Sequence, residues 1–207
     1  MRKTRIALFV AVLSGLLAAC GGSYFQMTQT HMEKAAAGKP IRDTLVIVVV
    51  DDQEIKTVFE DYFKKRLTAA GVETIVSKDV LPAHKERQLE KQDIVDVVEK
   101  NGNDSVLITH LVGLDESEAF NRDLPRVYRS YYGFYSYAWG YVEWPTTYKE
   151  NVKLTIETRL YDVKTESLIW AGESKLSNPK TPGKAIGQVV DAVMQALEKN
   201  NLLPNAS

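Results

Sequence analysis

The chain has little of what enzymes and metal proteins use for chemistry. Its 207 residues include one cysteine, Cys20, and three histidines, His31, His84 and His110. A lone cysteine excludes an internal disulfide, and histidines so far apart in sequence match no metal-ligand pattern. The G-x-S-x-G, H-E-x-x-H and P-loop motifs are also missing. The sequence therefore predicts no metal, no cofactor and no catalytic residues, and it gives an enzymatic activity no support.

Charge of one sign and long apolar runs are scarce as well. The 26 Lys and Arg residues nearly balance the 27 Asp and Glu residues, for a formal net charge of −1. Such a balance provides no basic footprint for nucleic acid, so we expect no nucleic-acid partner. Beyond residue 19 no apolar run approaches the roughly 20 residues that a transmembrane helix needs. The length suits one domain that buries its core without help from metals or disulfides.

The first twenty residues form the most specific pattern in the chain. The basic residues Arg2, Lys3 and Arg5 precede an apolar stretch from Ile6 to Ala19, whose small final residues lead into Cys20. This pattern resembles a bacterial lipoprotein signal, in which the cysteine thiol is acylated and becomes the new N-terminus. The alternative is an ordinary secretory signal with a cysteine placed there by chance.

The lipoprotein resemblance implies an anchor and a location. Residues 1–19 are then a signal peptide, and the mature chain keeps 23 basic against 27 acidic residues, a formal charge of about −4. Acyl chains such as palmitate on Cys20 give stable anchoring, which a single chain does not. Gly21 and Gly22 follow the cysteine and no Asp does, which implies the periplasmic face of the outer membrane. Residues 20–42 show no sustained periodicity, so we expect the lipidated cysteine to continue into a flexible tether.

The folded part is predicted to open with a β-α-β unit. The β-branched run 44–50 is typical of a strand buried on both faces. Asp51 and Glu54 have capping-box spacing, so we expect Asp51 to be the N-cap of the helix that follows. Gly71 ends that helix, and residues 72–76 form a second, parallel strand.

The second half is predicted to alternate between helix and strand and then to form a hairpin. A helix centred on residues 94–98 leads into an interior strand over 104–113. Residues 151–161 alternate between apolar and polar side chains, which predicts a strand with one solvated face. Residues 168–176 return as its antiparallel partner. Thr181, followed by proline, is the expected N-cap of a last helix.

Together these elements predict a single domain over residues 43–203 of the α/β (α+β) class. Its single mixed β-sheet has the order β-α-β-α-β-β-β-α, with an aromatic-rich hairpin extension. This order is similar to that of the TolB N-terminal domain family and of outer-membrane lipoproteins of related design. The chain also resembles a family of uncharacterised lipoproteins with a Gly/Tyr-rich insertion before the final hairpin. These resemblances imply envelope adaptor or assembly work rather than catalysis.

Ten of the 19 aromatic residues fall within positions 128–148, where strand-period alternation over 135–141 predicts a β-hairpin. Two interpretations remain open. The rings pack over an open face of the sheet with their hydroxyls at the water boundary, or they form an exposed recognition surface. Such a surface suits a protein partner or a like subunit, and stacked rings also suit a glycan. The candidate partner-binding residues are Tyr131, Tyr132, Tyr135, Tyr137, Trp139, Tyr141 and Trp144.

The leading functional prediction is a lipid-anchored, non-enzymatic protein-binding or assembly module that uses the aromatic hairpin, with an envelope protein or a second copy as its partner. The first alternative is a peptidoglycan-binding lipoprotein. The second is a hydrolase using Asp51, Asp52 or His110, because α/β folds often place functional groups at the carboxyl ends of strands. A helix cap explains Asp51 without chemistry, and a histidine on a buried strand is typically a hydrogen-bonded core residue.

Overall fold

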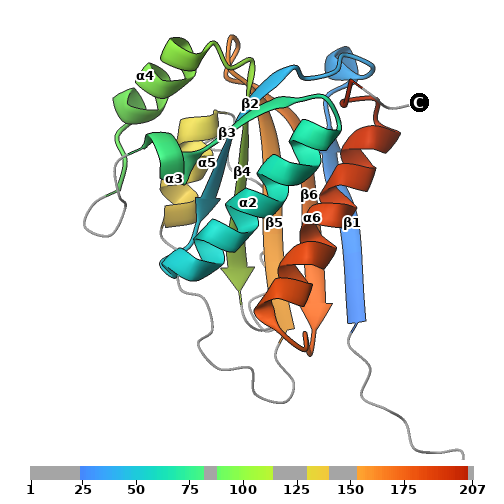
Figure 1. The fold of residues 1–207 in the computed structure, drawn as a ribbon. Helices are drawn as coiled ribbons and strands as arrows, with labels where there is room; N and C mark the ends of the chain where they lie inside the picture. The colour runs from blue at the N-terminus through green and yellow to red at the C-terminus, as the bar shows by residue number, and fades with distance from the viewer. Residues whose placement is uncertain (1–23, 82–87, 114–129, 140–152, 205–207) are drawn as a thin grey trace, which may run out of the picture.

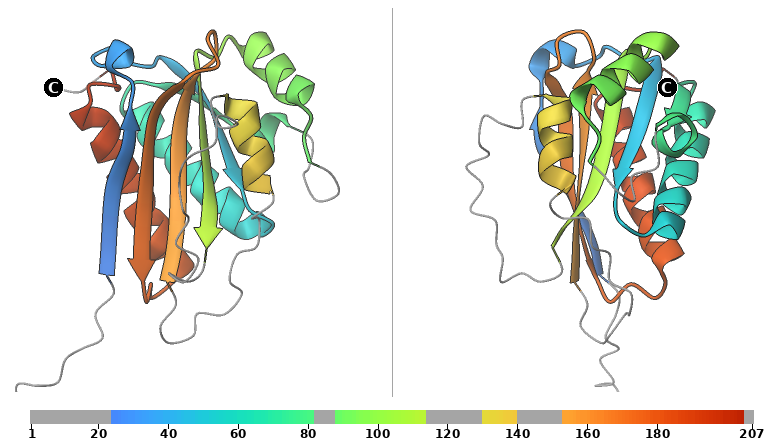
Figure 2. Two further views of the ribbon diagram at one scale, coloured as in Figure 1. Left: turned by 180° about the vertical axis from the view of Figure 1, so that it is seen from behind. Right: turned by 90° about the vertical axis from the view of Figure 1, so that its left-hand side faces the viewer.

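The computed structural model describes residues 24–81, 88–113, 130–139 and 153–204. Within them, a single six-stranded sheet has the order β1-β6-β5-β4-β2-β3 and carries helices on both faces (Figure 1; Figure 2). The strands are β1 (Tyr24–Met32), β2 (Asp43–Val49), β3 (Glu73–Val76), β4 (Ser105–Gly113), β5 (Lys153–Asp162) and β6 (Leu168–Ser177). The helices are η2 (Lys34–Ala36), α2 (Gln53–Ala69), α3 (Ser77–Val80), α4 (Lys91–Asn101), α5 (Tyr131–Ala138) and α6 (Pro182–Lys199). The predicted fold class, a single mixed sheet with helices, is confirmed.

The parallel half of the sheet forms as its sequence pattern predicts. β2 pairs in parallel with β3 on one side and with β4 on the other, and its last six residues are buried. The helix cap differs from the expectation by one residue. Asp52, and not Asp51, is the N-cap of α2, because its carboxylate accepts the backbone N–H groups of Glu54 and Ile55 at 2.9 and 3.0 Å.

The antiparallel half consists of β4, β5, β6 and β1 in that spatial order. Asp162 fixes the turn between β5 and β6, because its Oδ1 accepts the N–H and the hydroxyl of Thr165, each at 2.7 Å. Thr181 is the N-cap of α6, as predicted, and accepts the N–H of Lys184 at 3.3 Å.

The prediction of a flexible tether is wrong for the residues of strand β1. Residues 24–32, which were predicted to belong to a flexible segment, pair with β6 along its length. Phe25 and Met27 pack against the core beneath α6, and the side chain of Gln29 reaches Trp170 and Asn200. Short-range periodicity missed this strand because its pairing depends on partners about 140 residues further along the chain. Only residues 21–23 separate Cys20 from the sheet.

The two faces of the sheet carry separate cores. Helices α2 and α6 lie side by side over one face (Figure 1), where Phe59, Phe63 and Val193 are among the buried residues. Helices α4 and α5 pack on the other face, shown edge-on in Figure 2, where Ile94 and Phe134 are buried.

Helix α5 also covers the face of β5 that was predicted to be exposed to solvent. The polar face of this strand was predicted to be solvated, but Glu157 and Arg159 are only 3% and 1% exposed. Phe134 of α5 lies over the Arg159 guanidinium, with the Cζ atom 4.2 Å from the ring centroid. The alternating pattern was correct for a strand, and the prediction of solvent on its second face was wrong because a distant segment covers it.

Candidate functional sites

The central part of the aromatic segment forms a helix and not the predicted β-hairpin. Ser130 caps α5 by accepting the N–H of Gly133 at 3.2 Å. The buried positions Tyr131, Phe134, Tyr135 and Ala138 recur at helical spacing, three or four residues apart. The rings at 135, 137 and 139 therefore do not share a strand face. Instead, the buried rings lie along one side of the helix, which packs against the sheet.

The predicted partner-binding residues are divided by this arrangement. Tyr131 and Tyr135 are 2% and 1% exposed, and the Tyr135 hydroxyl accepts the N–H of Leu89 at 3.1 Å. Three others, Tyr132, Tyr137 and Trp139, are half-buried beside that core. Tyr141, Trp144 and the lipidation candidate Cys20 lie outside the described residues.

Beneath α5 lies a buried charged array that the sequence did not reveal. Glu157 Oε1 accepts two hydrogen bonds from Arg159, from Nε at 3.0 Å and from Nη2 at 2.8 Å. The Nε2 atom of His110 lies 3.7 Å from Glu157 Oε2. The His110 ring also meets Phe134 and Tyr137 edge-on, with centroid distances of 5.1 and 5.7 Å. The signal for this array was the buried strand that carries His110, but its partners come from a strand nearly fifty residues away.

The Glu157 carboxylate and the Arg159 guanidinium stabilise each other in this array. Burial alone raises the pKa of Glu157, but His110 and Arg159 together hold that pKa below its ordinary value. Burial also raises the pKa of the Tyr161 hydroxyl, which lies beside Arg159. Because a carbonyl oxygen can only accept, His110 Nδ1 donates to the backbone oxygen of Leu111 at 2.9 Å. The His110 Nε2 atom then points at the carboxylate.

In the described part of the chain, a small cavity lies beside His110. The cavity that adjoins His110 has a volume of about 10 Å³, enough for one water molecule at most. Burial, close packing and mutual pairing of the charges make the array a structural element that fixes α5 on the sheet. Among the described residues, no group of His, Cys, Asp and Glu side chains could hold a metal ion. No helix in those residues is long and apolar enough to span a membrane.

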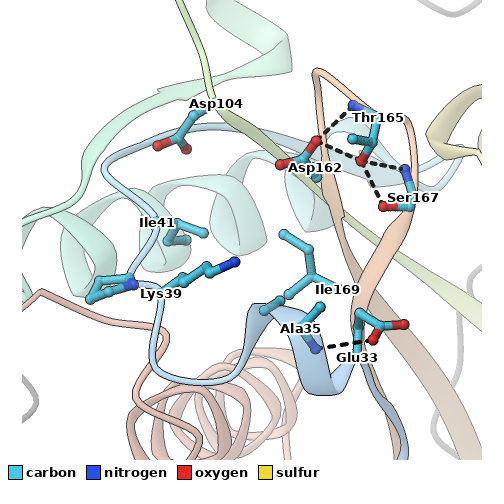
Figure 3. A pocket seen from close by; sticks show the side chains of 11 residues that line it. Glu33, Ala35, Lys39, Ile41, Asp104, Asp162, Thr165, Ser167 and Ile169 are labelled. Carbon is cyan, nitrogen blue, oxygen red and sulfur yellow. Dashed lines mark hydrogen bonds between the residues drawn. The ribbon is translucent and has the colours of Figure 1, made fainter.

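A larger pocket of about 310 Å³ lies at the opposite end of β1 from Tyr24 (Figure 3). Three segments that are distant in sequence build it: the connection from β1 to β2, the start of β4, and the turn between β5 and β6. Ile41 and Ile169 form an apolar floor. The connection from β1 includes Gly38, whose φ of 72° is readily adopted only by glycine.

The charged groups of this pocket face it from different sides. Asp104 accepts the N–H groups of Arg42 and Asp43 at 3.0 and 3.3 Å, and Asp162 is held by the turn described above. Glu33 accepts the N–H of Ala35 at 3.1 Å. The Lys39 ammonium extends between these carboxylates into the pocket, as Figure 3 shows. Sequence reasoning missed this site because none of its three segments carries a motif.

Comparisons with known proteins found similarity only to solved structures. No family model matches the chain, and no curated protein matches it. A PelC dodecamer from Paraburkholderia phytofirmans is similar at 9% identity and a TM-score of 0.48, covering 86% of this chain and 99% of that one. The lipoprotein GNA1162 from Neisseria meningitidis is similar at 15% identity and a TM-score of 0.42, covering 76% and 99%. Because these identities and TM-scores are low, the functional proposals rest on the residues of this chain and not on these similarities.

Proposed function

We propose that this chain is a lipid-anchored, non-enzymatic binding module on the periplasmic face of the outer membrane. The observation that carries the proposal is the distance in sequence between Cys20 and the sheet. Tyr24 begins β1 four residues after Cys20. Because four residues span at most about 14 Å, acyl chains on Cys20 hold the folded domain against the leaflet. The Gly21-Gly22 pair after the cysteine supports the outer membrane as the location.

The direction of β1 places the pocket at a defined distance from the anchor. The strand runs from Tyr24 to Met32, and Glu33 of the pocket follows it immediately. Nine residues of strand extend about 30 Å. The pocket is therefore separated from the anchored end by one full length of the sheet.

The lining of the pocket indicates the chemistry of its partner. Glu33, Asp104 and Asp162 provide three carboxylates, and Lys39 provides one ammonium group, around an apolar floor. The net negative lining favours a segment that carries basic groups, while Lys39 offers one contact to an anionic group. A volume of about 310 Å³ suits a few side chains of a protein partner. Peptide recognition of this kind needs no catalytic residues.

The half-buried rings of α5 provide a second, smaller candidate surface. Tyr132, Tyr137 and Trp139 remain available in part for a protein contact. Glycan stacking needs neighbouring exposed rings, and the large exposed hydrophobic residues among those described are Tyr24 on β1 and Tyr62 on α2. We therefore favour a protein over a glycan as the partner.

Anchoring is tested by comparing the wild-type protein with Cys20→Ser in cells grown with a labelled fatty acid. The proposal predicts label on the wild-type protein, its recovery with outer-membrane vesicles after a high-salt wash, and loss of both in the variant. Equal membrane retention of the two proteins contradicts it.

The binding surface is tested by placing a photo-crosslinking amino acid at Ser167, on the rim of the pocket. The matched control places it at Lys65, an exposed position on α2. A third variant places it at Tyr132. A discrete adduct from Ser167 that disappears with Lys39→Glu supports the pocket. Adducts from Tyr132 alone assign the contact to the aromatic helix instead.

A further inference from the structure

The two outer strands of the sheet are protected to different degrees. β3 is four residues long and begins with the exposed charge of Glu73. Where β3 ends, the Glu60 carboxylate accepts the backbone N–H of Val48 at 3.4 Å, in place of a further strand residue. β1 forms the other edge over nine residues and contains no Asp, Glu, Lys, Arg or Pro. Short strands, charges and prolines are the usual means of preventing edge-to-edge pairing, and β1 has none of them.

The first part of β1 is a regular template for another strand. Its pairing with β6 is uninterrupted from Tyr24 to Gln29, and the register shifts only between Gln29 and His31. Among the described residues, no strand pairs with its outer edge, which Figure 1 shows at the side of the molecule. Phe25 and Met27 are half-buried on the side of α6, while Gln26 and Thr28 are exposed on the opposite face.

We propose that β1 pairs antiparallel, edge to edge, with β1 of a second copy of this chain, so that one continuous sheet crosses a two-fold axis. A two-fold axis perpendicular to the sheet keeps each face on its own side. The row containing Phe25 and Met27 then continues into the same row of the second copy and gains cover from water. Because Tyr24–Gln29 carries no charge, no like charges meet at the junction. The alternation of half-buried and exposed side chains in β1 therefore matches that of a second, antiparallel copy of the same strand.

The anchor at Cys20 is compatible with this pairing, a step that rests on the proposed function. In a pairing centred on Met27, the two copies of Tyr24 lie roughly 20 Å apart at 3.4 Å per residue. Each spacer reaches about 14 Å, so both anchors enter one leaflet when the paired strands run along its surface. Confinement to one leaflet also raises the effective concentration of copies.

A cysteine scan of the full-length, membrane-bound protein tests the pairing. With Cys20 acylated, an introduced cysteine is the sole free thiol in the mature chain. The scan runs from Tyr24→Cys to Gln29→Cys, with wild type as the baseline. In a two-fold antiparallel pair, one residue alone lies opposite its own copy. Because a disulfide needs Cα atoms about 4.4–6.8 Å apart, the dimer yield should peak at that residue and fall roughly tenfold two positions away.

Lys175→Cys is the matched control, because Lys175 is exposed on the same face of the sheet and pairs with Gln26. It lies one strand inward, so its own copy is roughly 15 Å away in the proposed dimer, beyond disulfide reach. A peak within Tyr24–Gln29 with little product at Lys175 supports the pairing. No dimer at any scanned position, or equal yields at all positions and at Lys175, overturns it.

Charge exchange provides a second measurement on differently tagged full-length copies. Gln26→Lys with Thr28→Lys should abolish co-purification of the two tags, and so should Gln26→Glu with Thr28→Glu, because like charges face each other across the axis. Co-expression of the basic and acidic variants should restore it, and failure to do so contradicts the pairing. The fatty-acid labelling of Cys20 is read separately, so loss of the anchor and loss of the pairing are distinguishable.

Discussion

Trp170 donates its indole N–H to the side-chain oxygen of Gln29, at 3.1 Å from Nε1 to Oε1. The indole is fully buried, and Asn200 at the end of α6 donates to the same oxygen at 2.8 Å. One amide group thus joins the first strand, the sixth strand and the last helix. Together with the pairing of β1 and β6, this link holds residues 24–32 in the domain.

Replacing Gln29 with Ala should therefore weaken the whole fold. The change removes the acceptor of a buried indole N–H, and such a group costs about 1–3 kcal/mol when it is left unsatisfied. Denaturant unfolding of the protein should show that loss. Gln26→Ala is the control, because Gln26 is exposed on the opposite face of the same strand, and its effect should stay within about 0.5 kcal/mol. Equal effects of the two variants contradict the proposed link.

Gly172 should tolerate no larger residue. A Cβ atom at this position would lie 2.5 Å from Cη2 of Trp170 and 2.7 Å from Cε of Met27. Gly172→Ala should therefore cost about 1–3 kcal/mol by overpacking. At Gly183 in the first turn of α6, a Cβ meets nothing within 4 Å. Gly183→Ala should leave the midpoint of thermal unfolding unchanged or raise it, and a drop as large as that of Gly172→Ala would be evidence against this packing.

Glu157→Gln should destabilise the protein strongly, because it removes the carboxylate that accepts two hydrogen bonds from the buried Arg159. Breaking a buried pair in this way costs about 3–5 kcal/mol. Glu166→Gln, which removes the exposed contact of Glu166 with Lys91, should cost less than about 1 kcal/mol. Urea unfolding of the two variants measures the difference, and comparable losses contradict a structural role for the array.

The same carboxylate predicts the direction of the pH dependence. His110 and Arg159 hold the pKa of Glu157 below its ordinary value of 4.5. A carboxyl whose pKa is lower in the folded state contributes stability above pH 4.5, and that contribution is lost as the pH falls toward the folded-state pKa. The free energy of unfolding should therefore decrease on acidification below pH 4.5, and less steeply in Glu157→Gln. An identical slope for both proteins assigns the effect to other groups.

The fold was predictable where the sequence contains a continuous apolar run or a residue that caps a helix. The β-branched run of β2 and the cap at Thr181 each carry their own signal, and the structure confirms both. Strand β1 has weak periodicity and depends on Trp170, so its sequence reads as a linker. Helix α5 illustrates the same limit. The cap at Ser130 and the helical spacing of the buried rings were missed because the rings also alternate with the period of a strand.

The candidate sites were harder to predict than the fold. His110 lay in a strand recognised as buried, but Glu157 and Arg159 were assigned to solvent because the helix that covers them was not foreseen. The pocket around Lys39 joins three loops that no local pattern connects. Long-range contacts decide both sites, and a single sequence contains little information about such contacts.

Lipidation of Cys20 can be measured by mass spectrometry of the mature protein isolated from envelopes. The anchoring proposal predicts an N-terminal peptide that starts at Cys20 and carries the added mass of its acyl chains. An unmodified Cys20, in a protein that washes freely out of the envelope fraction, would contradict it.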